Sequence, residues 1–75
     1  MTKSAARQRV MDEGGLDGLF FLETYQLMAY LGISSGKVKM LMEDGLPYGK
    51  NGGKLIFKRS EVDQWCNRSF FHPAP

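Results

Sequence analysis

The fold of this chain is decided by residues 22–65, which read LETYQLMAYLGISSGKVKMLMEDGLPYGKNGGKLIFKRSEVDQW. From Thr24 onward, apolar residues recur at helical spacing until Gly32, a residue type that commonly ends helices. Ser34 or Ser35 can begin a second helix, because a serine oxygen accepts hydrogen bonds from the unpaired amides of a first turn. The stretch therefore opens with two short helices joined by a tight turn.

The second helix has one side for the core and one side for solvent. Val38, Leu41 and Met42 fall at positions i, i+3 and i+4, which predicts a buried stripe. Gly45 can end the helix, and Pro47 prevents it from resuming because proline has no amide hydrogen to donate. A new element must therefore begin after Pro47.

That element is a hairpin, because the apolar period changes from 3.6 to 2. Leu55 and Phe57 alternate with outward residues, and Asn51-Gly52-Gly53 supplies the backbone freedom of a tight turn, with residues 48–50 as the partner strand. Ser60-Glu61-Val62-Asp63 then opens a third helix. Helix, turn, helix and hairpin is the order of a winged helix-turn-helix. We expect a small α+β fold of about three helices and a two-stranded wing.

Flanking segments surround a single domain, which we place at residues 19–67. Residues 1–18 are predicted to form a flexible N-terminal arm, since glycines at 14, 15 and 18 interrupt any helix and no apolar period develops. Residues 68–75, which include Phe70 and Phe71, are predicted to be a C-terminal tail. A domain of this size buries only about 60% of its unfolded surface, so its core is small.

Composition argues against an enzyme or a secreted protein. The chain has one cysteine, which excludes an internal disulfide and fits a reducing cytosol, and it has no long apolar segment. Cys66 and His72 could supply only two ligands, whereas a zinc site needs three or four. A Cys–His nucleophilic site would also need a third group to orient the histidine, and none is evident. We expect a cytoplasmic protein with no catalytic residues, metal, cofactor, small-molecule substrate or membrane contact.

Positive charge is concentrated in one part of the sequence. The net charge is +2, but six of the ten lysines and arginines lie between residues 32 and 59, opposed there by Glu43 and Asp44. Residues 1–10 hold three more. A basic helix followed by a basic hairpin is the charge pattern of a surface that binds nucleic acid.

The second helix is the candidate recognition helix, through Ser35, Gly36, Lys37, Lys39 and Met40. The two lysines lie near its N-terminus, where the helix dipole already favours phosphate. Glycine lets the backbone approach DNA, and an outward methionine can touch a thymine methyl. The acidic pair at the other end repels phosphate, so only the first two turns should approach a duplex. The alternative is that both lysines are only solvated.

The hairpin is the candidate wing, through Lys50, Asn51, Lys54, Lys58 and Arg59. Lys50 and Lys54 bracket the turn, Asn51 lies at its tip, and the last two are expected to be outer phosphate contacts. Charged hairpins also serve to discourage sheet aggregation, which is the alternative interpretation.

Residues 22–66 resemble the excisionase family of small DNA-binding proteins, whose fold is like the DNA-binding domain of the MerR regulators. The resemblance is carried by Leu31-Gly32-Ile33-Ser34, Val38, Leu41, Gly45-Leu46-Pro47, Gly52-Gly53-Lys54, Phe57, Ser60-Glu61-Val62 and Trp65. The family often has threonine where Glu23 stands, and polar or basic residues where Met40 and Ile56 stand.

This resemblance implies a bacterial or phage-encoded recombination directionality factor, which binds and bends double-stranded DNA so that an integrase favours excision. One module of this size covers only about 600–1,000 Å² on DNA, so we expect cooperative self-association on repeated sites or a recombinase partner. Similar domains also occur in transcriptional regulators and in small terminase subunits that package DNA. Those roles remain open, as does a protein-interaction module that uses Met40, Ile56, Phe70 and Phe71.

Overall fold

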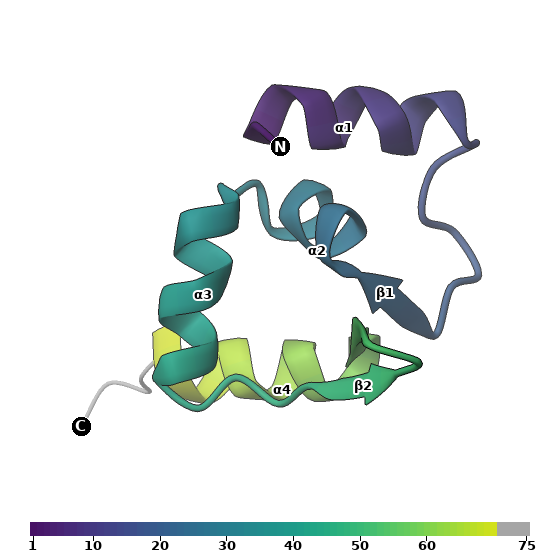
Figure 1. The fold of residues 1–75 in the computed structure, drawn as a ribbon. Coiled ribbons are helices and arrows are strands. Elements are labelled where there is room, and N and C mark those ends of the chain that lie inside the picture. Colours follow the sequence, from purple (N-terminus) through teal and green to yellow (C-terminus); the bar gives the residue numbers. More distant parts are fainter. Residues whose placement is uncertain (71–75) are drawn as a thin grey trace.

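The computed structural model describes residues 1–70, and within them it has four helices and a three-stranded antiparallel sheet (Figure 1). In chain order the elements are α1 (Lys3–Asp12), β1 (Phe21–Glu23), α2 (Thr24–Leu31), α3 (Ser35–Glu43), β2 (Gly49–Asn51), β3 (Lys54–Lys58) and α4 (Arg59–Phe70). This confirms the small α+β class and is compatible with a winged helix-turn-helix. It adds one helix and one strand to the expected set.

The helix-turn-helix is formed by α2 and α3. Gly32 ends α2 with a left-handed backbone, φ 67°, and Ile33 donates its amide hydrogen to the Met28 carbonyl oxygen at 3.0 Å. Ser34 caps α3, since its hydroxyl oxygen accepts from the Lys37 amide at 3.2 Å. Of the two serines that the sequence left open, the first is therefore the cap, and Ser35 is the first residue of the helix.

The sheet places the wing beside the helix-turn-helix. The strand order is β1-β3-β2, with Leu22 opposite Phe57 and Asn51 opposite Lys54. Leu22 and Phe57 are both completely buried, which ties the central strand to the core. The hairpin turns at Gly52 and Gly53, whose positive φ angles of 60° and 86° match the predicted loop.

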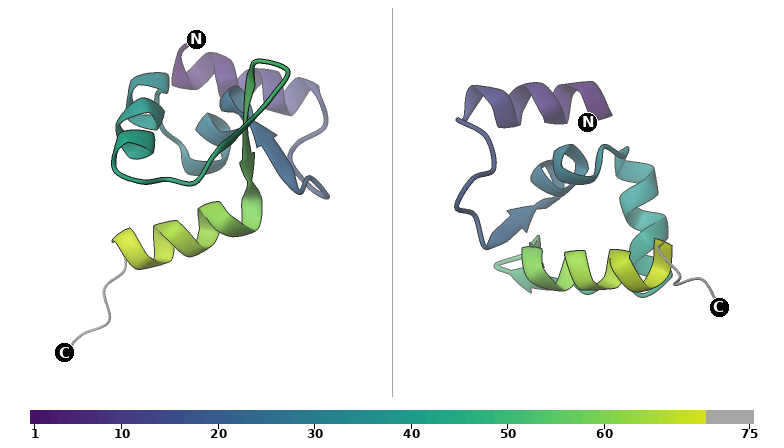
Figure 2. Two further views of the ribbon diagram at one scale, coloured as in Figure 1. Left: turned by 60° about the horizontal axis from the view of Figure 1, so that its bottom comes forward. Right: turned by 180° about the vertical axis from the view of Figure 1, so that it is seen from behind.

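One core joins all of these elements except β2, whose residues are exposed, and it lies between α1 and α4. The two helices cover opposite sides of the α2, α3 and sheet layer, as both views of Figure 2 show. The buried apolar side chains are Ala6, Val10, Leu22, Tyr25, Leu27, Met28, Val38, Leu41, Leu46, Phe57 and Val62. Trp65, predicted to face the core, is partly buried against this cluster.

The predicted flexible arm over residues 1–18 is wrong. Residues 3–12 form α1, which is capped by the Thr2 hydroxyl oxygen accepting from the Ala5 amide at 3.1 Å. Ala6 and Val10, one helical turn apart, are buried against α2. Two small buried residues make too weak a pattern to detect as a period, yet they suffice to dock the helix.

The predicted tail also needs correction at its start. Residues 68–70 continue α4, and the Phe70 ring packs edge-on against Trp65 with 5.6 Å between ring centroids. Phe71 and the rest of that predicted tail fall outside the described residues. Across residues 1–70, no helix combines the length and the apolar character required to cross a bilayer.

Candidate nucleic-acid interface

A hollow of about 340 Å³ separates α3 from the hairpin. Ser35, Gly36 and Lys39 line it from α3, while Leu55 lines it from β3. Thr24, the first residue of α2, lies between them. The predicted recognition helix and the predicted wing therefore face one concave surface.

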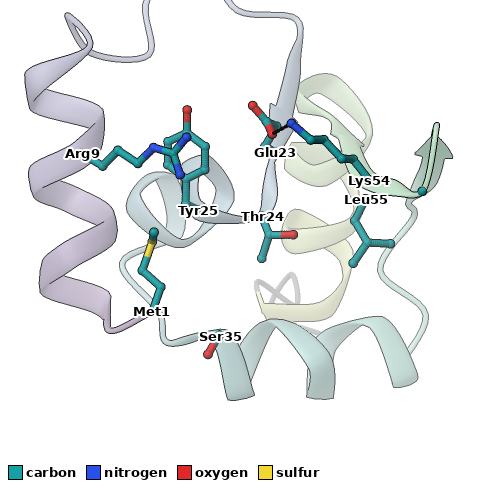
Figure 3. A pocket seen from close by; sticks show the side chains of 9 residues that line it. Met1, Arg9, Glu23, Thr24, Tyr25, Ser35, Lys54 and Leu55 are labelled. Carbon is teal, nitrogen blue, oxygen red and sulfur yellow. Dashed lines mark ion pairs between the residues drawn. The ribbon is translucent and has the colours of Figure 1, made fainter.

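A second hollow, of about 480 Å³, continues the first. It shares Thr24, Ser35 and Leu55 with it and extends to Gly53 and Lys54 at the hairpin turn. Figure 3 shows these side chains around the opening, with Ser35 on α3 below and Lys54 on the hairpin to the right. We name the two hollows together the α3–wing groove, after the elements on either side of it. The groove brings together Ser35, Gly36, Lys39 and Lys54 among the residues predicted from sequence.

The two lysines of α3 lie on different flanks of the helix. Residues two apart are rotated by about 160° around a helix axis, so Lys39 borders the groove while Lys37 lies on the other side. Both side chains are exposed, and Met40 points outward with 55% of its surface accessible. Lys37 and Met40 therefore belong to the outer face of α3 and not to the groove wall.

The wing residues divide into those at the turn and those at its base. Lys50 and Asn51 on β2 are exposed, opposite Leu55 and Lys54 respectively. Lys54 lies at the groove, where its Nζ is 3.5 Å from Oε1 of Glu23. An acidic side chain of β1 therefore lies beside the wing lysine in the groove, and the lysine partly neutralises it.

Lys58 and Arg59 lie at the far end of β3, away from the groove. They line a separate hollow beside Leu19 and Phe20. The Arg59 guanidinium donates to the Leu16 carbonyl oxygen at 3.1 Å and stacks over Tyr30, 4.9 Å from the ring centroid. Arg59 thus fixes the loop before β1 against α2, and its phosphate contact stays a prediction.

The sequence did not mark as site residues five that line the groove: Met1, Arg9, Glu23, Thr24 and Tyr25. The Tyr25 hydroxyl donates to Glu13 at 2.5 Å, and the Arg9 guanidinium lies 3.9 Å above the ring. This hydrogen bond, followed by burial and the Glu13 charge, raises the pKa of Tyr25. The only sequence signal was a hydroxyl residue at the start of a helix, and nothing marked Arg9, because α1 was not expected to dock.

The described residues offer little basis for thiol catalysis or metal binding. Burial raises the pKa of the Cys66 thiol, and the nearby Asp63 charge adds to this, so the reactive thiolate is disfavoured. Among residues 1–70, no three His, Cys, Asp or Glu side chains gather as metal ligands would. His72, the other residue considered for metal binding, lies outside this range.

No protein-family model, curated protein or solved structure matches this chain. The groove and its charges are therefore the features that bear on function.

Proposed function

We propose that the protein binds double-stranded DNA through α3 and the hairpin, and that it acts as an excisionase-like recombination directionality factor. The observation that carries DNA binding is the α3–wing groove, in which Lys39 and Lys54 approach the same concave surface from opposite walls. The choice of excisionase rests on the resemblance of residues 22–66 to that family. The protein would act in the bacterial cytoplasm.

In this proposal the first two turns of α3 enter the major groove. Gly36 lets the helix backbone come close to the bases, and Met40 offers an apolar contact to a thymine methyl. Lys37 and Lys39, on different flanks, would contact phosphates of the two strands that border the groove. Glu43, which is exposed at the end of α3, keeps the last turn away from the duplex.

The wing would lie on the neighbouring backbone or minor groove. Lys50 and Lys54 bring charge to the turn, and Asn51 both donates and accepts hydrogen bonds. With about four lysines on phosphates, log K should fall with log salt at a slope of about −3.6. Bending the duplex between α3 and the wing would add sequence preference through the cost of deformation.

The test is a titration of duplex DNA with wild-type protein and with the double variant Lys37→Ala, Lys39→Ala. We expect affinity to fall by at least about tenfold, because two phosphate contacts are lost. The melting temperature should change little, since both side chains are exposed. Wild-type affinity in the double variant would remove α3 from the interface.

An excision assay separates the recombination role from a role in transcription. With a purified integrase and an attachment-site substrate, a directionality factor should stimulate excision, and it should lose that effect in the double lysine variant. A transcriptional regulator of a phage or mobile element would bind DNA without changing the yield of excised product. That result would contradict the proposed excisionase role but not the proposed DNA binding.

Protein interaction is the second candidate function, and exposed apolar side chains favour it. Phe20 is 79% exposed, and Phe21, 56% exposed, lines a hollow together with Tyr48, which is 51% exposed. Surfaces of this kind often contact partners, and a recombinase or a terminase would be such a partner. A chain used only for protein contacts would fail to shift random duplex DNA at low salt.

A further inference from the structure

The helix α1 reaches the same groove as α3 and the hairpin. It packs on α2 through Ala6 and Val10, and this docking directs Arg9 toward the opening. The Arg9 side chain is about half exposed, at 51%, and its guanidinium lies over the Tyr25 ring at 3.9 Å. An arginine stacked on an aromatic ring keeps its N–H edge available for a planar, two-point contact with phosphate.

The position of Arg9 complements that of Lys54. In Figure 3, Arg9 enters from α1 on one side of the hollow, and Lys54 enters from the hairpin on the other. Tyr25 and the Glu23 carboxylate, which pairs with Lys54, lie between these two cations, and Thr24 and Ser35 lie below them toward α3. A phosphate strand that crosses the hollow would meet a cation at each edge, would displace Glu23 from Lys54, and would pass the hydroxyl groups on its α3 side.

We infer that α1 is a third DNA-contacting element, in which Arg9 binds a backbone phosphate on the strand that flanks the α3 site. This inference rests on the proposed DNA binding, and it enlarges the footprint beyond a helix and a wing. The contact is specific to one flank of α1. Arg7 lies about 160° around the helix from Arg9, beside Leu16 and away from the groove.

In the protein without DNA, the Glu13 carboxylate forms an ion pair with the Arg9 guanidinium. Its Oε2 atom is 3.5 Å from Nε of Arg9, one helical turn away, and its Oε1 atom accepts the Tyr25 hydroxyl. A phosphate must compete with this carboxylate for the guanidinium. Removing the Glu13 charge while keeping an oxygen acceptor should therefore strengthen DNA binding.

The experiment compares Arg9→Gln with Arg7→Gln in the full chain, by fluorescence anisotropy on one labelled duplex at several salt concentrations. Both variants lose one positive charge from α1. We expect Arg9→Gln to bind at least about threefold more weakly than Arg7→Gln, and to lower the salt slope by about 0.9. Arg9→Lys should recover only part of the affinity, because lysine keeps the charge but not the planar two-point contact, and circular dichroism should show folded protein in every case.

Glu13→Gln should increase DNA affinity, which would not happen if Arg9 had only a structural role. This variant therefore tests the Arg9 contact even if Arg9→Gln fails to fold. We expect it to bind about two- to fourfold more tightly than wild type, while Asp12→Gln stays closer to wild type. If the wild type binds but Arg9→Gln matches Arg7→Gln, or Glu13→Gln gains nothing over its control, α1 is not a contact and the α3–hairpin proposal stands. A wild type that binds no duplex would overturn both.

Discussion

Lys54 Nζ on β3 lies 3.5 Å from the Glu23 carboxylate on the neighbouring strand β1, at the edge of the α3–wing groove. Glu23 is the residue that precedes α2, at a position where the excisionase family often has threonine. The acidic group has two opposing effects here. It neutralises a wing lysine and repels phosphate, but it also favours the positive N-terminal end of α2.

We therefore predict that Glu23→Gln tightens DNA binding and slightly lowers stability. Affinity should rise by about 1.5- to 5-fold, the range of an exposed ion pair, because Lys54 no longer has a competing partner. The free energy of unfolding should fall by about 0.3–1 kcal/mol as the helix end loses its favourable charge. Anisotropy titration and urea unfolding measure the two effects separately.

Glu61→Gln is the matched control, since it removes the same charge from an exposed site on α4 outside the groove. An equal gain in affinity from both variants would mean that only net charge matters. The prediction that Glu23 weakens DNA binding by pairing with Lys54 would then be wrong.

Docking of α1 gives a stability prediction. Val10→Ala should lower the free energy of unfolding by about 1–2 kcal/mol, because two buried methyl-sized groups leave the contact with α2. Met11→Ala removes a larger side chain that is 71% exposed, and it should change stability by less than about 0.5 kcal/mol. Chemical denaturation of both variants, with amide exchange across residues 3–12, tests whether this helix is docked in solution.

The Tyr25 hydroxyl predicts a loss of stability in alkali. Its pKa is raised in the folded protein, chiefly by the hydrogen bond to Glu13, so the folded state keeps this proton longer than the unfolded state does. The stabilising contribution is complete below the ordinary tyrosine pKa of about 10 and is lost as pH rises through the higher folded value. Wild-type protein should therefore lose stability above about pH 10 more steeply than Tyr25→Phe, when both are unfolded by urea across pH 8–11.

Local signals predicted the elements between Thr24 and Phe57 well. Serine caps, glycine stops and the Gly52-Gly53 turn act over a few residues, so the sequence records them directly. The facing of α3 and the hairpin also followed, because Leu41 and Phe57 must both reach one small core. Once those two side chains are buried, Lys39 on α3 and Lys54 on the hairpin lie on neighbouring surfaces.

Features that depend on contacts between distant residues did not follow from the sequence. The docking of α1 depends on Ala6 and Val10, which are too few to form a pattern, and its loss from the predicted fold concealed Arg9 as well. Arg59 looked like one more wing cation, but its partners Leu16 and Tyr30 are 43 and 29 positions away in the chain. Basic residues look alike in a sequence whether they hold a loop or face solvent.

Gly36→Ala is predicted to change folding and DNA binding in opposite directions. A Cβ atom at residue 36 would meet no protein atom closer than the Ser34 hydroxyl oxygen at 4.0 Å, so the fold has room for it. Alanine in the first turn of α3 should raise stability by up to about 1 kcal/mol, because glycine loses more backbone entropy on folding. The same methyl group would stand between the helix backbone and the bases, so affinity should fall by at least about threefold. Thermal melting and duplex titration on the one variant decide this: higher stability with unchanged affinity would show that the first turn of α3 stays clear of the DNA.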